Sequence, residues 1–271
     1  MENSDSPEPI RNPQSAIRNL IHRPPFIIHH FATLGSTSDQ LKQMTAAPEF
    51  TCVIADEQTA GRGRRDRAWH STPGDGLYLS VLLRPVIPAA RISLLSLMCA
   101  VVVAETIARY NIAGIDIKWP NDVLVNERKL SGILIEGTSA GSDLPRIIAG
   151  LGVNLNHEAF PPELRDTATS LAIESGQRID AAEFRDQLLM TLAQWYERLR
   201  HDGEQAIPER WQALSSYARG RHVTVTLDDE QVTGVTSGLT DTGALRMHLA
   251  DGTIRTIIAG EITHLRKNAE C

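Results

Sequence analysis

The sequence contains few of the residues that build disulfide frameworks or metal sites. Only three of its 271 residues are cysteines, Cys52, Cys99 and Cys271, and they show neither paired nor metal-type spacing. This odd, scattered set predicts reduced thiols and a cytoplasmic location. Cys52 and Cys99 lie in apolar runs, so we interpret them as core residues. The nine histidines are scattered as well, and we expect no metal-ligating residues.

Long apolar segments are also lacking. The longest run, residues 94–104, is well short of the roughly 20 residues that a membrane-spanning helix needs. Residues 1–25 are rich in Asn, Ser, Pro and charge, and they have no apolar centre of the kind found in signal peptides. We therefore expect residues 1–25 to form a flexible leader, and we expect no membrane partner.

Common signatures of nucleotide binding are missing too. The glycine-rich segment after residue 60 is not Gly-x-Gly-x-x-Gly, because Asp66 holds its last position, and no Gly-Lys-Ser/Thr ending occurs. These absences argue against Rossmann and P-loop sites. The net charge of −6 disfavours a general nucleic-acid binder. What is present, 42% hydrophobic and 22% charged residues, is typical of a globular protein with a real core.

Hydrophobic periodicity divides the chain into a large α+β part and a small all-β part. We expect strands at residues 26–33, 51–56, 76–83, 115–119, 123–125, 129–136 and 146–156. We expect helices after residues 36–38 and at 92–110, 163–174 and 180–214, the last interrupted near Gly203 and Pro208, and a polar loop at 139–145. From Arg221 onward, short strands and turns predict a small β-barrel. We place the two domains at 26–214 and 215–271.

A loop dense in arginine follows the second predicted strand. Its glycines, Gly61 and Gly63, allow positive φ and a close approach of the backbone to a ligand. Its guanidinium groups suit phosphate and carboxylate, and they belong to Arg62, Arg64, Arg65 and Arg67. Because these charges repel one another, we expect a loop that is mobile when empty and ordered by an anion. The alternative is a solvated basic loop or a nucleic-acid patch, which the glycines and the position after a strand disfavour.

Two further clusters place polar groups next to predicted strands. The run Lys118-Trp119-Pro120-Asn121-Asp122 ends one strand, and Asp122 either positions metal-bound phosphates or accepts a proton. A turn-capping role for Asp122 fits these residues equally well. Lys129 opens an apolar strand on the face of Ser131, where it needs an anionic partner unless it ends the hairpin in water.

Glycines mark places where something approaches the sheet closely. Gly132 interrupts the strand that Lys129 opens. Gly150, Gly152 and Asn154 share a face at period two, which leaves a flat floor beside an amide suited to a heterocycle. A bulge or close strand packing explains the glycines alone, and Asn154 on the same face favours the floor.

In this order, the features resemble the biotin protein ligase family over roughly residues 30–156, with a compatible barrel at the end. The matching motifs are Ser36-Thr37-Ser38, Glu57-Gln58-Thr59-Ala60-Gly61-Arg62-Gly63-Arg64-Arg65 through Trp69, Gly76-Leu77-Tyr78-Leu79-Ser80, Lys118-Trp119-Pro120-Asn121-Asp122, Lys129-Leu130-Ser131-Gly132-Ile133-Leu134 and Gly150-Leu151-Gly152-Val153-Asn154. The resemblance implies an α+β catalytic domain of the kind shared with class II aminoacyl-tRNA synthetases, a mixed sheet with helices, followed by an SH3-like barrel.

The resemblance also implies the reaction. Biotin and Mg·ATP give biotinyl-5′-AMP and pyrophosphate, and a lysine of a biotin carboxyl carrier protein, in acetyl-CoA carboxylase or a related carboxylase, then takes the biotinyl group and releases AMP. Some family members carry an N-terminal DNA-binding domain. Because about twenty-five residues precede the catalytic pattern here, we expect no DNA binding. The sequence leaves the oligomeric state open, a homodimer included.

The resemblance assigns roles to particular side chains. Catalytic roles fall to Lys129, Arg64 and Asp122. Biotin-binding roles fall to Ser36, Thr37, Ser38, Gln58, Arg62, Gly63, Arg64, Lys129 and Gly132. Roles at ATP and the adenylate fall to Arg62, Arg64, Arg65, Arg67, Trp69, Lys118, Asn121 and Asn154.

The chain departs from the family pattern at two positions. Ser38 stands where Asn is usual, and Asp66 stands where Gly is usual in the loop. We expect Ser38 to change the reach of a ring contact, and Asp66 to pair with a neighbouring arginine and stiffen the loop. A lipoate or octanoate ligase or transferase is the nearest alternative function, and a non-catalytic nucleic-acid-binding protein is an alternative of another class.

Overall fold

A computed structural model describes residues 17–138, 145–201, 205–228 and 230–263. The larger part is built on an eight-stranded sheet with the order β1-β2-β3-β4-β8-β7-β6-β5. Neighbouring strands are antiparallel except β2 and β3, which are parallel. The strands are β1 (Ile17–Arg23), β2 (Phe26–Leu34), β3 (Thr51–Gln58), β4 (Gly76–Leu83), β5 (Ile115–Lys118), β6 (Asp122–Val125), β7 (Arg128–Thr138) and β8 (Arg146–Asn154). The predicted α+β fold with a mixed sheet is confirmed.

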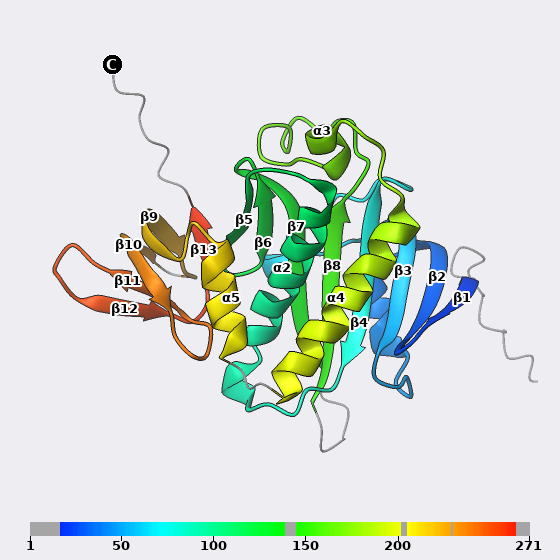
Figure 1. Ribbon diagram of the computed structural model, residues 1–271, viewed down its shortest axis with the longest axis horizontal. Coiled ribbons are helices and arrows are strands. Elements are labelled where there is room, and N and C mark those ends of the chain that lie inside the picture. Colours follow the sequence, from blue (N-terminus) through cyan, green and yellow to red (C-terminus); the bar gives the residue numbers. More distant parts are fainter. Residues whose placement is uncertain (1–16, 139–144, 202–204, 229, 264–271) are drawn as a thin grey trace, which may run out of the picture.

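Helices cover both faces of this sheet. On one face lie α2 (Leu94–Ile107), α4 (Ala181–His201) and α5 (Ala206–Leu214), as Figure 1 shows. The short helix α1 (Thr37–Gln43) covers the other face, where Leu41 packs against Val53 and Leu82. Successive side chains of β3 point to opposite faces of the sheet and pack into different hydrophobic cores. Cys52 belongs to the larger core, under α2, and Val53 to the smaller core, under α1.

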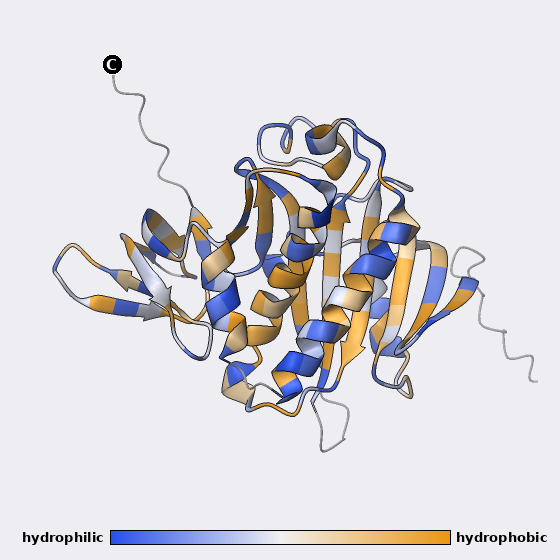
Figure 2. Ribbon diagram, in the orientation of Figure 1, coloured by the Kyte–Doolittle hydropathy of each residue, from blue (hydrophilic) through white to orange (hydrophobic). Residues whose placement is uncertain are grey.

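Helix α2 is the centre of the larger core. Nearly all its side chains are buried, and Figure 2 shows it as almost uniformly apolar, whereas α4 carries hydrophilic residues along one side. Ala89–Tyr110 has the length and hydropathy of a membrane span, but 67% of its most apolar window is buried inside the fold, as in a core helix. Cys99 lies in this core, where burial raises the pKa of its thiol to about 12. The interpretation of Cys52 and Cys99 as core residues is confirmed, and Cys271 lies outside the described residues.

A second, five-stranded antiparallel sheet follows, with the order β12-β11-β10-β9-β13. Its strands are β9 (Arg219–Thr226), β10 (Gln231–Leu239), β11 (Leu245–His248), β12 (Ile254–Ile257) and β13 (Glu261–Thr263). The turn between β10 and β11 docks on the larger part, where Trp119 Nε1 donates to Gly243 O at 3.1 Å and Ser93 Oγ donates to Thr242 O at 2.7 Å. This sheet fits the small barrel expected from the sequence.

Several expectations need correction. Within the expected leader, residues 17–23 form the edge strand β1, which pairs with β2 through register Arg23 to Phe26. The helix expected at 163–174 is wrong over most of its length, because only α3 (Leu171–Ser175) is helical. The interruption expected near Gly203 and Pro208 is confirmed, because α4 ends at His201 and α5 begins at Ala206. Pro208 lies in the first turn of α5, where its missing N–H would have no helical partner. Gly203, residues 1–16 and most of the expected loop at 139–145 lie outside the described residues.

Candidate active site

One cavity, of about 460 Å³, gathers every side chain that the resemblance assigns to binding or catalysis. It lies over β4, β7 and β8, between the arginine loop (residues 61–69) and the segment that follows β8. Its lining includes all the predicted residues: Ser36, Thr37, Ser38, Gln58, Arg62, Gly63, Arg64, Arg65, Arg67, Trp69, Lys118, Asn121, Asp122, Lys129, Gly132 and Asn154. Residues far apart in the sequence therefore meet in one place, whereas their individual roles stay predictions.

Parallel pairing of β2 and β3 forms the hydroxyl-rich end of the cavity. The two strands end side by side, with Leu34 opposite Gln58. Ser36 then caps α1, which places Thr37 and Ser38 in the first turn of the helix, facing the end of β3. Thr37 N donates to Gln58 Oε1 at 2.9 Å. This end of the cavity suits a ligand that carries both hydrogen-bond donors and acceptors.

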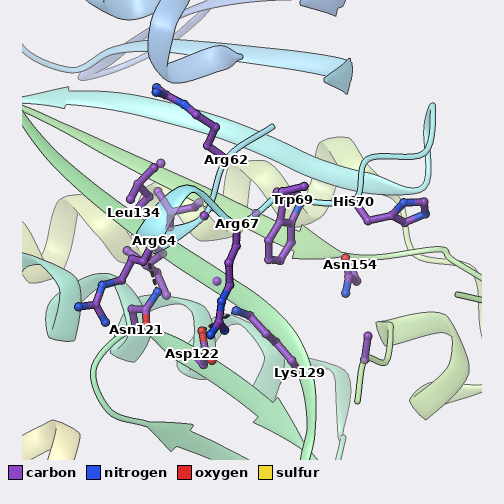
Figure 3. Close-up of a pocket in the computed structure, with 18 of the residues that line it drawn as sticks. Arg62, Arg64, Arg67, Trp69, His70, Asn121, Asp122, Lys129, Leu134 and Asn154 are labelled. Atoms are coloured by element: carbon purple, nitrogen blue, oxygen red, sulfur yellow. Dashed lines mark hydrogen bonds and ion pairs between the residues drawn. The ribbon is translucent and has the colours of Figure 1, made fainter. Parts of the chain in front are cut away.

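A buried carboxylate flanked by two lysines occupies another part of the cavity. Asp122 is only 8% exposed, and its Oδ1 lies 2.7 Å from Lys129 Nζ while its Oδ2 lies 3.7 Å from Lys118 Nζ. Figure 3 shows Asp122 and Lys129 pointing toward one another. Lys129 therefore has the anionic partner that the sequence called for. The two ammonium groups leave this part of the site with a net positive charge, as the binding of an acid or a phosphate requires.

A β-bulge decides where Lys129 points. Val123 pairs with Ser131 and Leu124 with Lys129, so Leu130 is the extra residue on β7. The expectation that Lys129 shares the face of Ser131 is therefore wrong. A Cβ on Gly132 would lie 3.1 Å from Lys129 Cε, so the lysine stem crosses the glycine. Ser131 is fully buried instead and donates to Gly152 O.

The arginine loop is tied down on two sides. Arg62 pairs with Asp39 at the start of α1, and Figure 3 shows it directed away from Asp122 and Lys129. On the other side, Arg65 lies 2.9 Å from Asp228, and Arg67 pairs with Glu261 through both its terminal nitrogens.

Arg64 reaches the small sheet as well. It donates to Gly260 O at 3.1 Å. Burial, followed by the charge of Arg65, lowers the pKa of Arg64. Arg64 is thus the arginine of the loop whose hydrogen bond goes to a neutral carbonyl rather than to a carboxylate, and it lines the cavity.

Asp66 has a backbone reason to be tolerated in the loop. Its φ is 56° and that of Arg65 is 54°, the left-handed region that glycine enters freely and Asp enters more readily than most residues. Among the described residues Asp66 makes no ion pair, so the expected pairing with a neighbouring arginine is not observed. Position 66 is therefore explained by conformation rather than by charge.

The indole of Trp69 lies on a floor made of glycine. A Cβ on Gly152 would lie 2.4 Å from the Trp69 ring, and one on Gly132 would lie 2.9 Å from it. Lys129 Nζ lies 5.6 Å from the centre of the same ring. Trp69 Nε1 is buried and has no hydrogen-bond partner among the described residues. The flat floor expected at Gly152 is thus covered by Trp69, while Gly150 faces Ser38.

Amide side chains at the cavity wall hold its backbone in place. Asn154 Nδ2 donates to Thr169 O at 3.0 Å, and Asn121 Nδ2 donates to Ile133 O at 2.8 Å. Each amide therefore already donates one N–H to a backbone carbonyl. Only its remaining N–H and its carbonyl oxygen can bind a ligand.

The sequence analysis missed one wall of the cavity. Phe160, Leu164 and Thr167 line it, and the segment is fixed by Lys129 N, which donates to Thr167 O at 2.7 Å. The wall continues to His157, which stacks on Phe160. Burial lowers the pKa of the His157 imidazole. The consecutive residues Pro161 and Pro162 gave no warning against the helix expected from residue 163, because proline is tolerated in the first turn of a helix.

Comparison with known proteins agrees with this fold. Residues 32–154 match the biotin/lipoate A/B protein ligase family, and residues 219–265 match the biotin protein ligase C terminal domain. These two matches define the class of the protein. The chain belongs to the biotin protein ligase family, as the following relatives make plain.

Three relatives illustrate the similarity. The bifunctional ligase/repressor BirA of Bacillus subtilis is 38% identical over 87% of this chain and 73% of its own length. The biotin--[acetyl-CoA-carboxylase] ligase of Paracoccus denitrificans is 32% identical over 79% of this chain and 90% of its own length. The biotin protein ligase of Aquifex aeolicus, solved with biotin and ATP, superposes with a TM-score of 0.77 at 30% identity, covering 87% of this chain and 97% of that one. The chain spans 66% of the BirA of Bacillus spizizenii.

Proposed function

We propose that this chain is a biotin–[biotin carboxyl-carrier protein] ligase. It activates biotin with ATP to biotinyl-5′-AMP and transfers the biotinyl group to one lysine of a carrier protein of acetyl-CoA carboxylase or a related carboxylase. The observation that carries the proposal is the single cavity that joins a hydroxyl-rich end to the pair Lys129–Asp122 and to the arginine loop. It offers the hydrogen bonds that a cyclic urea needs and the positive charge that a carboxylate and a phosphate need.

The first step follows from this arrangement. Ser36, Thr37 and Gln58 hold the ureido ring, and the valeryl chain reaches toward Lys129. The Lys129 ammonium orients the biotin carboxylate for attack on the α-phosphate and then offsets the charge that develops on the transferring oxygens. Arg64, held near Gly260, offsets the charge of the adenylate phosphate.

Transfer requires an incoming lysine amine that has lost its proton. Asp122 is the carboxylate in the cavity that lies closest to Lys129, and we assign it the task of accepting or positioning that proton. Trp69, Arg67 and the wall at Phe160 enclose the anhydride, which limits its loss to water. Lys118 and Asn121 stand at the phosphate end, and Asn154 at the adenine end.

Magnesium fits this site as a companion of ATP. Among the described residues no group of three or more His, Cys, Asp or Glu side chains is arranged to hold a metal ion. Asp122 already faces two lysines. Mg²⁺ commonly binds through one or two carboxylates together with substrate phosphates and water. We propose that Mg²⁺ would enter with ATP, held by its phosphates rather than by Asp122, and would neutralise phosphate charge there. We also propose that the protein acts in the cytoplasm.

An exchange assay separates the proposed acid from its rival. Incubation with ATP and labelled pyrophosphate is expected to give label in ATP when biotin is present and none above background when lipoate or octanoate replaces it. Exchange that depends on lipoate and not on biotin would overturn the proposed substrate. No exchange with any acid would overturn the proposed activation chemistry.

Replacing Arg64 by alanine tests whether the loop retains the intermediate. Arg64 is half-buried and lines the cavity, and a hydrogen bond to a charged group contributes about 1.5–3 kcal/mol. We expect biotinyl-5′-AMP to leave the enzyme about tenfold faster or more. Filter binding of labelled adenylate measures this loss. Arg91→Ala is the matched control, because Arg91 pairs with Asp241 of the small sheet but lies outside the cavity lining. Equal retention by both variants would mean that Arg64 does not hold the adenylate.

A further inference from the structure

Behind the hydroxyl-rich end of the cavity lies a serine to which the site assignment gives no role. Ser80, in the middle of β4, has no exposed surface and is absent from the cavity lining. Its Oγ lies 2.8 Å from Thr37 Oγ1 and 2.9 Å from Ser38 Oγ. Thr37 continues the contacts to Gln58. Four side chains thus form one chain of hydrogen bonds, in the order Ser38, Ser80, Thr37, Gln58.

The backbone fixes the direction of this chain. Thr37 N can only donate, so the Gln58 atom 2.9 Å from it must be the amide oxygen, and the amide orientation is set. The Thr37 hydroxyl lies 3.1 Å from the same oxygen, to which it must also donate. A hydroxyl has one proton, so Thr37 Oγ1 meets Ser80 as an acceptor, and Ser80 donates to it.

The same count then determines Ser38. Because the Ser80 proton goes to Thr37, Ser80 Oγ can meet Ser38 only by accepting, and the Ser38 proton goes to Ser80. All three hydroxyl protons are committed. Ser38 Oγ, which lines the cavity, retains only lone pairs for a ligand. At the other end, Gln58 Nε2 makes no hydrogen bond among the described residues and retains its protons.

Gly150 keeps room for this arrangement. A Cβ at Gly150 would lie 3.0 Å from Ser38 Oγ and 3.7 Å from Ser80 Oγ. A side chain at this position would therefore crowd the two serine hydroxyls. The short Ser38 side chain is what brings a hydroxyl within reach of Ser80. The departure from the family's asparagine at position 38 therefore creates the terminal link.

We propose that Ser80 is a positioning residue that sets the hydrogen-bond polarity of the ring-binding end of the site. Through it, Ser38 faces the ligand as an acceptor only and Gln58 as a donor. That polarity matches a cyclic urea, which offers N–H donors on either side of a carbonyl acceptor. The assignment rests on the proposed function, since it takes biotin as the ligand.

Ser80→Ala removes the middle link and frees the Ser38 proton to rotate toward the ligand. We expect the Kd and KM for biotin to rise by about five- to thirtyfold, as for loss of one or two ordered hydrogen bonds. We expect the KM for ATP and the kcat of the exchange reaction to stay within about twofold, because the phosphate end is untouched. Ser80→Cys, similar in size and a weaker donor, should fall between alanine and the wild type.

Thr51→Val is the matched control. Thr51 is also buried and also donates its hydroxyl proton, to Pro48 O at 2.8 Å, but it stands at the opposite end of β3 from Gln58. Its variant should bind biotin like the wild type. Thermal unfolding of each variant shows that it is folded before binding is compared.

The outcomes separate this inference from the function on which it rests. A wild-type chain that fails to bind biotin would overturn the proposed function. A wild type that binds biotin while Ser80→Ala binds it equally well would overturn only the role of Ser80. Equal losses for biotin and for ATP in Ser80→Ala would also overturn it, because they would mean that Ser80 supports the fold alone.

Discussion

Replacing Lys129 by alanine is expected to slow adenylate formation by about 10²- to 10³-fold, the range seen when one preorganised donor to a developing charge is removed. The reason is the position of its ammonium, 2.7 Å from Asp122 and beside Gly132, where the two proposed half-reactions would place charge. Biotin-dependent pyrophosphate exchange measures the first half-reaction, and single-turnover transfer to a carrier domain measures the second. Both are expected to fall.

Lys42→Ala is the control for charge and ion pairing. Lys42 also pairs with a partly buried carboxylate, Glu136, at 2.8 Å, but it is not part of the cavity lining. Its variant should keep exchange within a few-fold of the wild type. Thermal unfolding should show both variants folded, since Asp122 retains Lys118 as a partner. Exchange by Lys129→Ala at the level of Lys42→Ala would contradict the role given to Lys129.

Placing a methyl group at Gly152 is expected to expel the Trp69 indole from its seat. The added Cβ would lie 2.4 Å from a carbon of the Trp69 ring. This distance is shorter than van der Waals contact, so the ring or the strand would have to move. Overpacking of this kind costs about 1–3 kcal/mol, which corresponds to about 5- to 150-fold in an equilibrium constant. We expect the free energy of unfolding of Gly152→Ala to fall by this amount. We also expect its KM for ATP to rise. Denaturant unfolding and the exchange assay measure the two effects.

Gly137→Ala supplies the comparison. Gly137 lies on the neighbouring strand β7, and a Cβ there would meet only Ile147 Cδ1, at the ordinary contact distance of 3.8 Å. Its variant should match the wild type in both assays. If the two alanine variants behaved alike, Trp69 would not depend on the glycine floor.

Local patterns predicted most of the sheet, whereas the membership of the site came from the resemblance to a known family. The run of β-type residues at 76–83 matched β4, which is buried along nearly its whole length. The direction of Lys129 was not predictable, because a bulge at Leu130 shifts the phase of β7 and depends on pairing with β6. Edge strand β1 was missed because its side chains are largely exposed and show no alternation.

Long-range contacts account for the rest. The wall at Phe160 is ordered by backbone pairing with Lys129, more than thirty positions earlier, which no local propensity encodes. Attachment of the arginine loop to Asp228, Gly260 and Glu261 depends on how the small sheet docks. Asp66 illustrates the opposite case, since its positive φ explains the family's preference for glycine at a position where the sequence alone suggested an ion pair.

The most direct test is the mass of a purified biotin carboxyl carrier domain after incubation with this protein, biotin and Mg·ATP. We expect a gain of one biotinyl group on a single lysine, with release of AMP, that requires all three components and is lost from a carrier whose target lysine is replaced by arginine. A carrier that stays unmodified while the protein is folded and binds ATP would contradict the assignment of this site to biotin transfer.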